Sequence, residues 1–309
     1  MRFRTDPAGL RGSIAPIVTP FHADGEVDLE SVRRLVRWQL DNGSNGLSTG
    51  GSTGEPSSLS IAERAAVMAA VVDEAGPDVG FMPGTGSVKM EETLELTGIA
   101  RDLGADVALV VAPYYARPTQ DALVEWYGTV AAAYPDLPIV AYNVPIRTAV
   151  DVAPETLARM MRKHDNIVGI KETTKDFEHV SYVFHHCGRD TLVWCGIELL
   201  CLPTLALGGT GLISAVANIA PGAVAELARS FDAGDLETAQ RLHYELHPLV
   251  DLIFTETNPA PAKWLLERLG MLPSGHVRLP LVGPAEASQA KILERYELGK
   301  HLVPAALVA

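Results

Sequence analysis

Eight short apolar segments recur along the chain, and each is followed by a helical pattern or by a turn and then a helical pattern. The segments span residues 13–19, 46–49, 79–83, 106–112, 138–143, 166–170, 191–195 and 210–215. Strands that alternate with helices of this kind pair in parallel through right-handed crossovers. Eight such units in about 235 residues predict an α/β fold, a (β/α)8 TIM barrel, with a doubly wound sheet as the alternative.

Local signals predict where several of the helices begin. Residues 29–36 place their apolar side chains on one helix face. Ser60 and Glu63 have the spacing of a capping box, which predicts a helix from there to about Glu74. Pro154 suits the first turn of a further helix, because its missing N–H would have no partner there anyway.

The pattern changes after residue 234. Residues 235–254, 260–269 and 284–298 have helical periodicity with no strand pattern between them. We therefore expect a catalytic barrel at residues 1–234 and a C-terminal helical extension at residues 235–309.

Composition limits the classes of partner. The chain has 309 residues, of which 47% are hydrophobic, and its 25 basic and 38 acidic side chains give a net charge of -13. A surface of this sign repels phosphate backbones, so we expect no nucleic-acid partner. The N-terminus shows no apolar leader, and the 3 cysteines have no disulfide-framework spacing, so we expect a cytoplasmic protein with unreactive thiols.

Residues 199–225 carry no charged side chain, and this length would suffice to cross a membrane. Pro203 and Pro221 interrupt the stretch, however, and Glu198 and Glu226 flank it without a basic anchor. We therefore expect a buried helix, strand and helix here, and no membrane partner.

Lys171 stands directly after the apolar segment 166–170. Catalytic side chains of a barrel lie at the C-terminal ends of its strands. Burial at such a place disfavours the charged form of an amine, and a neutral amine can attack a carbonyl to form a Schiff base. A lysine that simply reaches solvent is the alternative.

Tyr142 ends the segment before that of Lys171. Neighbouring strands lie roughly 4.8 Å apart, so a tyrosine there could relay protons to a carbon next to an imine. A packed aromatic ring whose hydroxyl is satisfied is the alternative.

Two glycine-rich segments could approach a ligand. Residues 50–55 contain the adjacent hydroxyls of Ser52 and Thr53 and could hold a carboxylate or a phosphate, with a tight turn as the alternative. Residues 208–211 precede the last strand, where barrels often bind phosphate. A phosphosugar enzyme is therefore a rival interpretation, although no basic residue lies nearby to support it.

Five segments that occur in order carry a resemblance. They are GGSTGE, PYYARPTQ, YNVPIRT, GIKET and ETNPAPAKW. Together they resemble the dihydrodipicolinate synthase / N-acetylneuraminate lyase family of pyruvate-dependent class I aldolases, from about Ser13 to Pro280. The resemblance implies a carbon–carbon lyase with a (β/α)8 barrel, a C-terminal helical extension and a homotetramer built from two tight dimers.

The resemblance also implies roles for individual residues. Lys171 matches the lysine that forms a Schiff base with pyruvate, and Tyr142 matches the tyrosine that moves protons to and from the adduct. Thr53 and Tyr115 would complete a hydroxyl relay with Tyr142, and the second tyrosine of this relay lies close to or across a subunit interface in the family. Ser52 and Thr53 match the pair that holds the pyruvate carboxylate.

Further positions concern the second substrate. Arg147 matches the arginine that receives the carboxylate of aspartate semialdehyde, and a guanidinium pairs well with a carboxylate because it offers two parallel N–H groups. Gly196 and Ile213 match positions that line the substrate end. The covalent imine is the electron sink in this chemistry, so the resemblance implies no metal and no organic cofactor.

One segment departs from the commonest family pattern. WCGIELLCLP is more similar to a subgroup of 2,4-dihydroxyhept-2-ene-1,7-dioate aldolases, which release pyruvate and succinic semialdehyde. We expect dihydrodipicolinate synthase-like use of pyruvate and aspartate semialdehyde, with this aldolase as the alternative. A non-catalytic barrel that binds an oxo acid is the alternative from another class.

Overall fold

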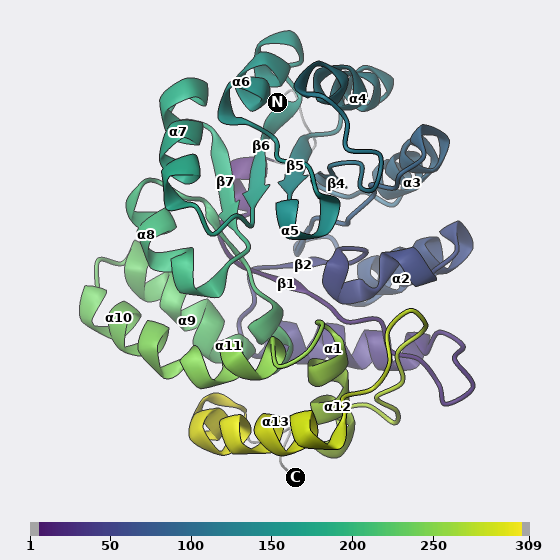
Figure 1. Ribbon diagram of the computed structural model, residues 1–309, viewed down its shortest axis with the longest axis vertical. Coiled ribbons are helices and arrows are strands. Elements are labelled where there is room, and N and C mark those ends of the chain that lie inside the picture. Colours follow the sequence, from purple (N-terminus) through teal and green to yellow (C-terminus); the bar gives the residue numbers. More distant parts are fainter. Residues whose placement is uncertain (1–5, 305–309) are drawn as a thin grey trace. The chain divides into compact units, whose positions relative to one another are not determined.

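The computed structural model describes residues 6–304 (Figure 1). Its contacts divide the described chain into two compact units. Unit 1 contains residues 6–11 and 80–213, and unit 2 contains residues 12–79 and 214–304. The predicted boundary between a barrel at 1–234 and an extension at 235–309 stays a prediction, and residues 1–5 and 305–309 lie outside the described residues.

Unit 1 contains a parallel sheet in which neighbouring strands follow the order β8-β7-β6-β5-β4. These strands are β4 (Ala108–Val111), β5 (Ile139–Asn143), β6 (Ile167–Glu172), β7 (Leu192–Cys195) and β8 (Gly211–Ile213). The short β3 (Gly80–Phe81) leads to a parallel bridge between Gly84 and Leu109, which places this segment beside β4. The strands are short and buried, as expected for a parallel sheet.

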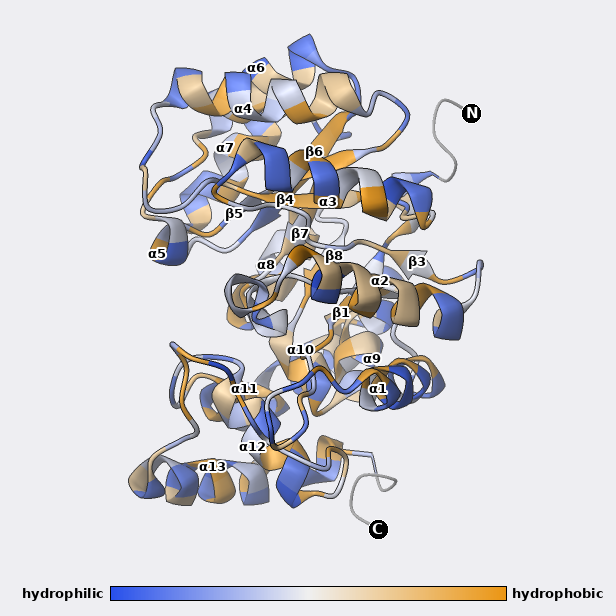
Figure 2. Cartoon of the chain, turned by 90° about the vertical axis from the view of Figure 1, so that its right-hand side faces the viewer, coloured by the Kyte–Doolittle hydropathy of each residue, from blue (hydrophilic) through white to orange (hydrophobic). Residues whose placement is uncertain are grey.

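Helices of unit 1 alternate with these strands in the sequence. They are α3 (Met90–Asp102), α4 (Gln120–Ala133), α5 (Pro145–Thr148), α6 (Pro154–Lys163), α7 (Phe177–Cys187) and α8 (Cys201–Ala206), with short 3-10 turns η1 (Pro7–Gly9) and η4 (Glu198–Leu200). Figure 2 shows apolar β4 and β6 and helices that carry polar residues along part of their surface. This is the distribution expected when helices pack one apolar face on a buried sheet.

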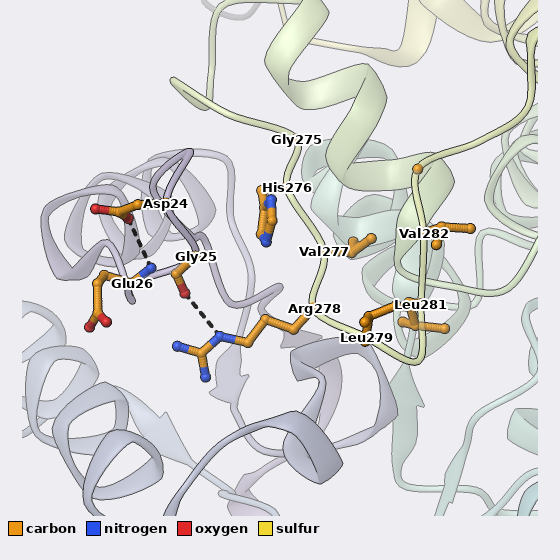
Figure 3. A pocket seen from close by; sticks show the side chains of 11 residues that line it. Asp24, Gly25, Glu26, Gly275, His276, Val277, Arg278, Leu279, Leu281 and Val282 are labelled. Carbon is orange, nitrogen blue, oxygen red and sulfur yellow. Dashed lines mark hydrogen bonds between the residues drawn. The ribbon is translucent and has the colours of Figure 1, made fainter.

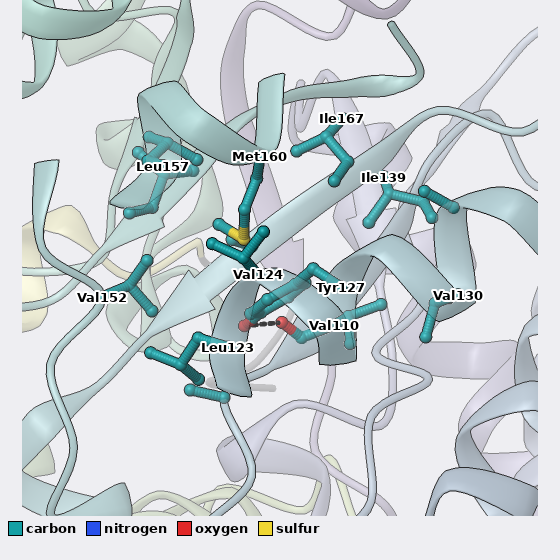
Figure 4. Close-up of a cluster of buried hydrophobic side chains, with 14 of the residues drawn as sticks. Val110, Leu123, Val124, Tyr127, Val130, Ile139, Val152, Leu157, Met160 and Ile167 are labelled. Carbon is teal, nitrogen blue, oxygen red and sulfur yellow. Dashed lines mark hydrogen bonds between the residues drawn. The ribbon is translucent and has the colours of Figure 1, made fainter. Parts of the chain in front are cut away.

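A buried cluster between strands and helices forms the core of unit 1 (Figure 4). Tyr127 of α4 lies in it, and its hydroxyl donates a hydrogen bond to the Val110 carbonyl at 3.0 Å. Burial raises the pKa of Tyr127 above its ordinary value. The bond matters because a buried hydroxyl without a partner would reduce stability by about 1–3 kcal/mol.

Unit 2 contains the parallel pair β1 (Gly12–Pro16) and β2 (Gly46–Ser48). Its helices are α1 (Leu29–Asp41), α2 (Ile61–Ala75), α9 (Pro221–Asp232), α10 (Leu236–Glu245), α11 (His247–Ile253), α12 (Ala260–Arg268) and α13 (Glu286–Gly299). Short 3-10 turns are η2 (Ser52–Gly54), η3 (Pro56–Ser58), η5 (Ala215–Asn218) and η6 (Lys300–Leu302). Helices alone follow η5 among the described residues, apart from the last 3-10 turn.

All eight predicted strands are present, and one of them ends later than expected. β6 continues to Glu172, so Lys171 lies within the strand and not after it. The extra pairing has a clear cause: the Gly196 N–H donates to the Glu172 carbonyl at 2.8 Å and prolongs the ladder with β7.

The helix signals are also confirmed, with one correction. Ser60 and Glu63 form the predicted capping box of α2, and Pro154 begins α6. The single helix predicted for residues 235–254 was wrong, because the chain forms α10 and α11 there. Pro248 lies in the first turn of α11 and has no N–H to continue the α10 hydrogen-bond ladder.

Residues 199–225 run from the end of η4 through α8, β8 and η5 into α9, so the predicted order of helix, strand and helix is confirmed. No helix within residues 6–304 is both long enough and apolar enough to cross a membrane.

Candidate active site

Lys171 and Tyr142 lie side by side at the C-terminal ends of β6 and β5. They are partners in the parallel register, so both side chains project on the same side of the sheet. The Lys171 Nζ lies 4.2 Å from the centroid of the Tyr142 ring. Each residue is 6% exposed. The structure therefore brings together the two residues that the sequence predicted to form the core of the site.

Lys171 has no ionic partner in the described part of the chain, since no Asp or Glu carboxylate oxygen lies within 4.0 Å of its Nζ. Lysines are rarely buried without a partner, because desolvation of an unpaired charge is costly. Folding alone does not explain why an amine is placed here against an aromatic face. An amine in this position can act as a nucleophile towards a carbonyl.

Gly196 leaves room for the Lys171 side chain. A Cβ atom at this position would lie 2.9 Å from Lys171 Cε and 2.2 Å from Thr173 Cγ2. Both approaches are closer than real Cβ contacts allow, so any side chain at residue 196 would displace the lysine. This contact supports the prediction that Gly196 borders the reacting centre.

Behind Lys171 and Tyr142 lies a polar group that we call the strand-end cluster. It consists of Asn143, Asp151, Glu172 and His179. Asn143 and Glu172 are the residues that directly follow Tyr142 and Lys171, and they pair in the same register. Because successive strand residues face opposite sides, the cluster lies on the other side of the sheet from the lysine and the tyrosine.

The strand-end cluster changes the proton affinity of its members. Burial alone would lower the pKa of His179, but its contacts with Asp151 and Glu172 outweigh burial and raise this pKa to about 10. Burial alone would raise the pKa of Asp151, whereas hydrogen bonds from His179 and Asn143 hold it below its ordinary value. At neutral pH these shifts favour an imidazolium at His179 and a carboxylate at Asp151.

Sequence reasoning missed His179 and Asp151 as functional candidates. The signal that could have found the cluster is the position of Asn143 and Glu172, each one residue beyond a candidate catalytic side chain. Glu172 is 2% exposed, so its side chain belongs to the packed interior and not to the solvated surface.

Ser52 and Thr53 lie in unit 2, in the 3-10 turn η2. The Thr53 hydroxyl accepts a hydrogen bond from Asn258 Nδ2 at 2.9 Å and is buried. Ser52 is partly exposed. Glu55 ends the turn with φ 53°, in the left-handed region that side chains other than glycine seldom adopt.

A buried ion pair holds this loop in place. Lys263 of α12 is 0% exposed, and its Nζ donates to Glu55 Oε1 at 2.7 Å and to the Thr19 carbonyl at 2.8 Å. Burial lowers the pKa of Lys263 to about 8, although Glu55 opposes this shift. Arg278 adds a backbone N–H bond to Glu55 Oε2 at 3.1 Å. These contacts account for the unusual backbone at Glu55.

The remaining predicted site residues all belong to unit 1 and differ in exposure. Tyr115 is 94% exposed and has φ 70°, and Arg147 is exposed on the one-turn helix α5. Ile213 is buried at the end of β8. The structure thus leaves Tyr115 and Arg147 on the surface of the single chain.

Unit 2 also contains a pocket of about 710 Å³, formed by residues 24–26 and by residues of the segment 275–283 (Figure 3). None of the predicted catalytic residues lines it. Arg278 reaches into this region, but its guanidinium is engaged by the Gly25 carbonyl, the Ser58 carbonyl and Glu63.

The cysteines and the second glycine-rich segment have structural explanations. Cys187, Cys195 and Cys201 are free thiols, and burial raises the pKa of both Cys187 and Cys195 to about 11. A Cβ at Gly209 would lie 2.8 Å from the Thr204 carbonyl oxygen, so this glycine permits close packing. Neither feature requires a ligand.

Comparisons with known proteins identify the family of the chain. The Dihydrodipicolinate synthetase family model matches residues 9–296. A 4-hydroxy-tetrahydrodipicolinate synthase of Thermus thermophilus is 44% identical over 293 residues, which cover 94% of this chain and 97% of that protein. The dihydrodipicolinate synthase of Acinetobacter baumannii, solved in complex with pyruvate, has a TM-score of 0.90 at 37% identity, with 94% of this chain and 99% of that chain covered.

A monomeric dihydrodipicolinate synthase variant also matches, with a TM-score of 0.90 at 38% identity over 96% of this chain and 99% of that chain. Strands, helices and matches together define a (β/α)8 barrel lyase with C-terminal helices. The chain belongs to the dihydrodipicolinate synthetase family. Membership removes the phosphosugar enzyme and the non-catalytic barrel as alternatives.

Proposed function

We propose that this enzyme is a 4-hydroxy-tetrahydrodipicolinate synthase that joins pyruvate to aspartate semialdehyde through an imine on Lys171. The observation that carries the proposal is the buried Lys171 amine, which has no carboxylate partner among the described residues and lies against the Tyr142 ring. The name of the Thermus relative and the pyruvate complex of the Acinetobacter relative support the choice of substrates.

The chemistry follows from the amine. The Lys171 amine attacks C2 of pyruvate, and loss of water gives an iminium ion, which withdraws electrons from the neighbouring methyl group. Tyr142 receives a methyl proton and passes it on, so that an enamine forms. The enamine carbon attacks the aldehyde carbon of aspartate semialdehyde, and the new alkoxide takes up a proton. The amino group of the semialdehyde part then attacks the imine carbon, which closes a six-membered ring and releases the Lys171 amine. The iminium supplies the electron sink, so these steps call for no metal and no organic cofactor.

The other predicted residues hold the substrates in this proposal. Ser52 and Thr53 bind the pyruvate carboxylate, and the bond from Asn258 fixes the direction of the Thr53 hydroxyl. Arg147 binds the carboxylate of the aldehyde acid as a bidentate partner. Gly196 and Ile213 border the substrate, and Tyr115 completes the hydroxyl relay with Thr53 and Tyr142.

The first test compares two aldehydes on one preparation. We expect kcat/KM with aspartate semialdehyde to exceed that with succinic semialdehyde by about a hundredfold or more, roughly 2.7 kcal/mol of transition-state discrimination. The reverse preference would assign the chain to the heptenedioate-type aldolases. Reduction with borohydride in the presence of pyruvate should add a mass label at Lys171, and its absence would contradict the imine itself.

We further propose that the enzyme assembles as a homotetramer of two tight dimers. Tyr115 and Ile146 of unit 1 are 94% and 86% exposed, and large exposed apolar side chains are typical of surfaces that a partner covers. Sedimentation velocity should give the mass of four chains, and Tyr115→Asp should lower it. A fully active monomer would contradict this part of the proposal.

A further inference from the structure

The strand-end cluster begins one residue beyond each of the two central side chains. Asn143 directly follows Tyr142 on β5, and Glu172 directly follows Lys171 on β6. Asn143 and Glu172 are partners in the parallel register of these two strands. Whatever fixes Asn143 relative to Glu172 therefore also fixes the ends of the strands that carry Tyr142 and Lys171.

Asn143 joins the members of the cluster to one another. Its Nδ2 lies within hydrogen-bond distance of both Glu172 carboxylate oxygens, at 3.2 and 3.0 Å, and of Asp151 Oδ1 at 2.7 Å. Its Oδ1 accepts from the Val152 N–H at 3.0 Å. Glu172 Oε1 also accepts from the Thr174 N–H at 2.7 Å. The amide and the carboxylate are thus held from several sides at once.

His179 ties this arrangement to a helix. It lies in the first turn of α7, whose N-cap is Asp176. Its Nδ1 lies 3.2 Å from Glu172 Oε2, and its Nε2 lies 3.2 Å from the Val152 carbonyl oxygen and 3.5 Å from Asp151 Oδ1. His179 is the cationic member of the cluster and faces both carboxylates.

We propose that His179 is a positioning residue for the reaction, which acts through Glu172 and Asn143 to fix the ends of β5 and β6 and so the approach of Tyr142 to the Lys171 adduct. This inference rests on the proposed function. It also explains why the carboxylate next to Lys171 in the sequence does not pair with the amine: Glu172 is held on the opposite side of the sheet by Asn143, Thr174 and His179.

Loss of the His179 ring would remove one of the groups that hold the buried Glu172 side chain in place. The strand ends would then relax, and proton transfer between Tyr142 and the adduct would lose its geometry. Proton transfer depends steeply on alignment, whereas binding of the pyruvate carboxylate involves other residues. The expected signature is a lower kcat for proton exchange with little change in KM.

The test uses His179→Gln, with His186→Gln as the matched control. His186 lies on the same helix α7, and its Nε2 contacts Glu155 of α6 at 3.0 Å. Pyruvate alone in deuterated buffer should exchange its methyl protons, which NMR can follow. We expect the exchange kcat of His179→Gln to fall about tenfold or more with KM within about twofold, and His186→Gln to resemble the wild type.

Asp151→Asn provides a second variant with less risk to folding, because Asp151 is half exposed. Asp151→Asn should also lower the exchange kcat, by a smaller factor than His179→Gln. If the wild type exchanges protons and folded His179→Gln does so at the same rate, the positioning role is overturned but the proposed function is not. An equal loss of exchange in His186→Gln would also overturn the positioning role. No exchange and no borohydride label in the wild type would overturn the proposed function itself, and the positioning role with it.

Discussion

The two units each bury a lysine, and the two lysines have opposite surroundings. Lys263 of unit 2 is 0% exposed and is paired with Glu55 at 2.7 Å. Lys171 of unit 1 is 6% exposed and has no carboxylate within 4.0 Å among the described residues. Each Nζ lies over an aromatic ring, at 4.0 Å from the centroid of Phe21 for Lys263 and at 4.2 Å from that of Tyr142 for Lys171.

Under the proposed function, this difference is what separates a structural lysine from a reactive one. Burial and an aromatic face are common to both, so neither distinguishes them. Lys263 is paired with the Glu55 carboxylate, so its amine takes part in an ion pair of the folded structure. Glu172, the carboxylate nearest to Lys171 in sequence, is held by the strand-end cluster and leaves the amine of Lys171 available for a carbonyl.

The largest expected effect is the loss of activity in Lys171→Met. Removal of a covalent nucleophile should lower kcat/KM on the order of 10⁴-fold or more. The borohydride label should disappear, while the melting temperature should stay equal or rise, because the substitution removes an unpaired buried amine. A variant that keeps the label would show that another lysine forms the imine and would break the comparison.

Lys263→Met should show the reverse pattern. It leaves Glu55 buried without its cation, so the free energy of unfolding should fall by about 3–5 kcal/mol. Urea unfolding measures this loss, and the borohydride label at Lys171 should persist in the folded fraction. Combining the change with Glu55→Gln should recover part of the loss. A Lys263→Met enzyme that remains as stable as the wild type would contradict a structural role.

Tyr142→Phe tests the aromatic ring that lies against Lys171, as the ring of Phe21 lies against Lys263. The ring remains, so the packing around Lys171 should be kept and stability should change little. The hydroxyl is lost, and with it a proton relay worth on the order of 10²-fold in kcat. Methyl-proton exchange of pyruvate measures the effect. If this variant exchanges the methyl protons as fast as the wild type, Tyr142 is a packing residue, as Phe21 is for Lys263.

The last prediction concerns how the stability of the enzyme changes with pH through His179. The folded state raises the pKa of His179 from 6.5 to about 10, so its contribution to stability is complete below about pH 6.5 and is lost as the pH rises through about 10. The stability gap between the wild type and His179→Gln should therefore narrow between these limits. Urea midpoints at several pH values test this, and a constant gap would argue that His179 is not the cation of the cluster.

Much of the fold was predictable because it depends on local patterns. The alternation of apolar segments with helical periodicity identified all eight strands, and Ser60 with Glu63 identified the start of α2. The single helix predicted for residues 235–254 failed because apolar periodicity continues across Pro248, whereas the backbone ladder does not. The end of β6 was missed because it depends on a hydrogen bond from Gly196, a distant part of the chain.

The sequence by itself determined the alternating elements and the candidates Lys171 and Tyr142, because each candidate stands at or directly after the end of an apolar segment. Only the tertiary structure decided which lysine is paired. Glu55 and Lys263 are 208 residues apart, and Asn143 and Glu172 are 29 apart, so no local pattern reveals either contact. The physical reason is that burial and ion pairing are properties of neighbours in space, and these contacts decide whether a buried amine serves folding or chemistry.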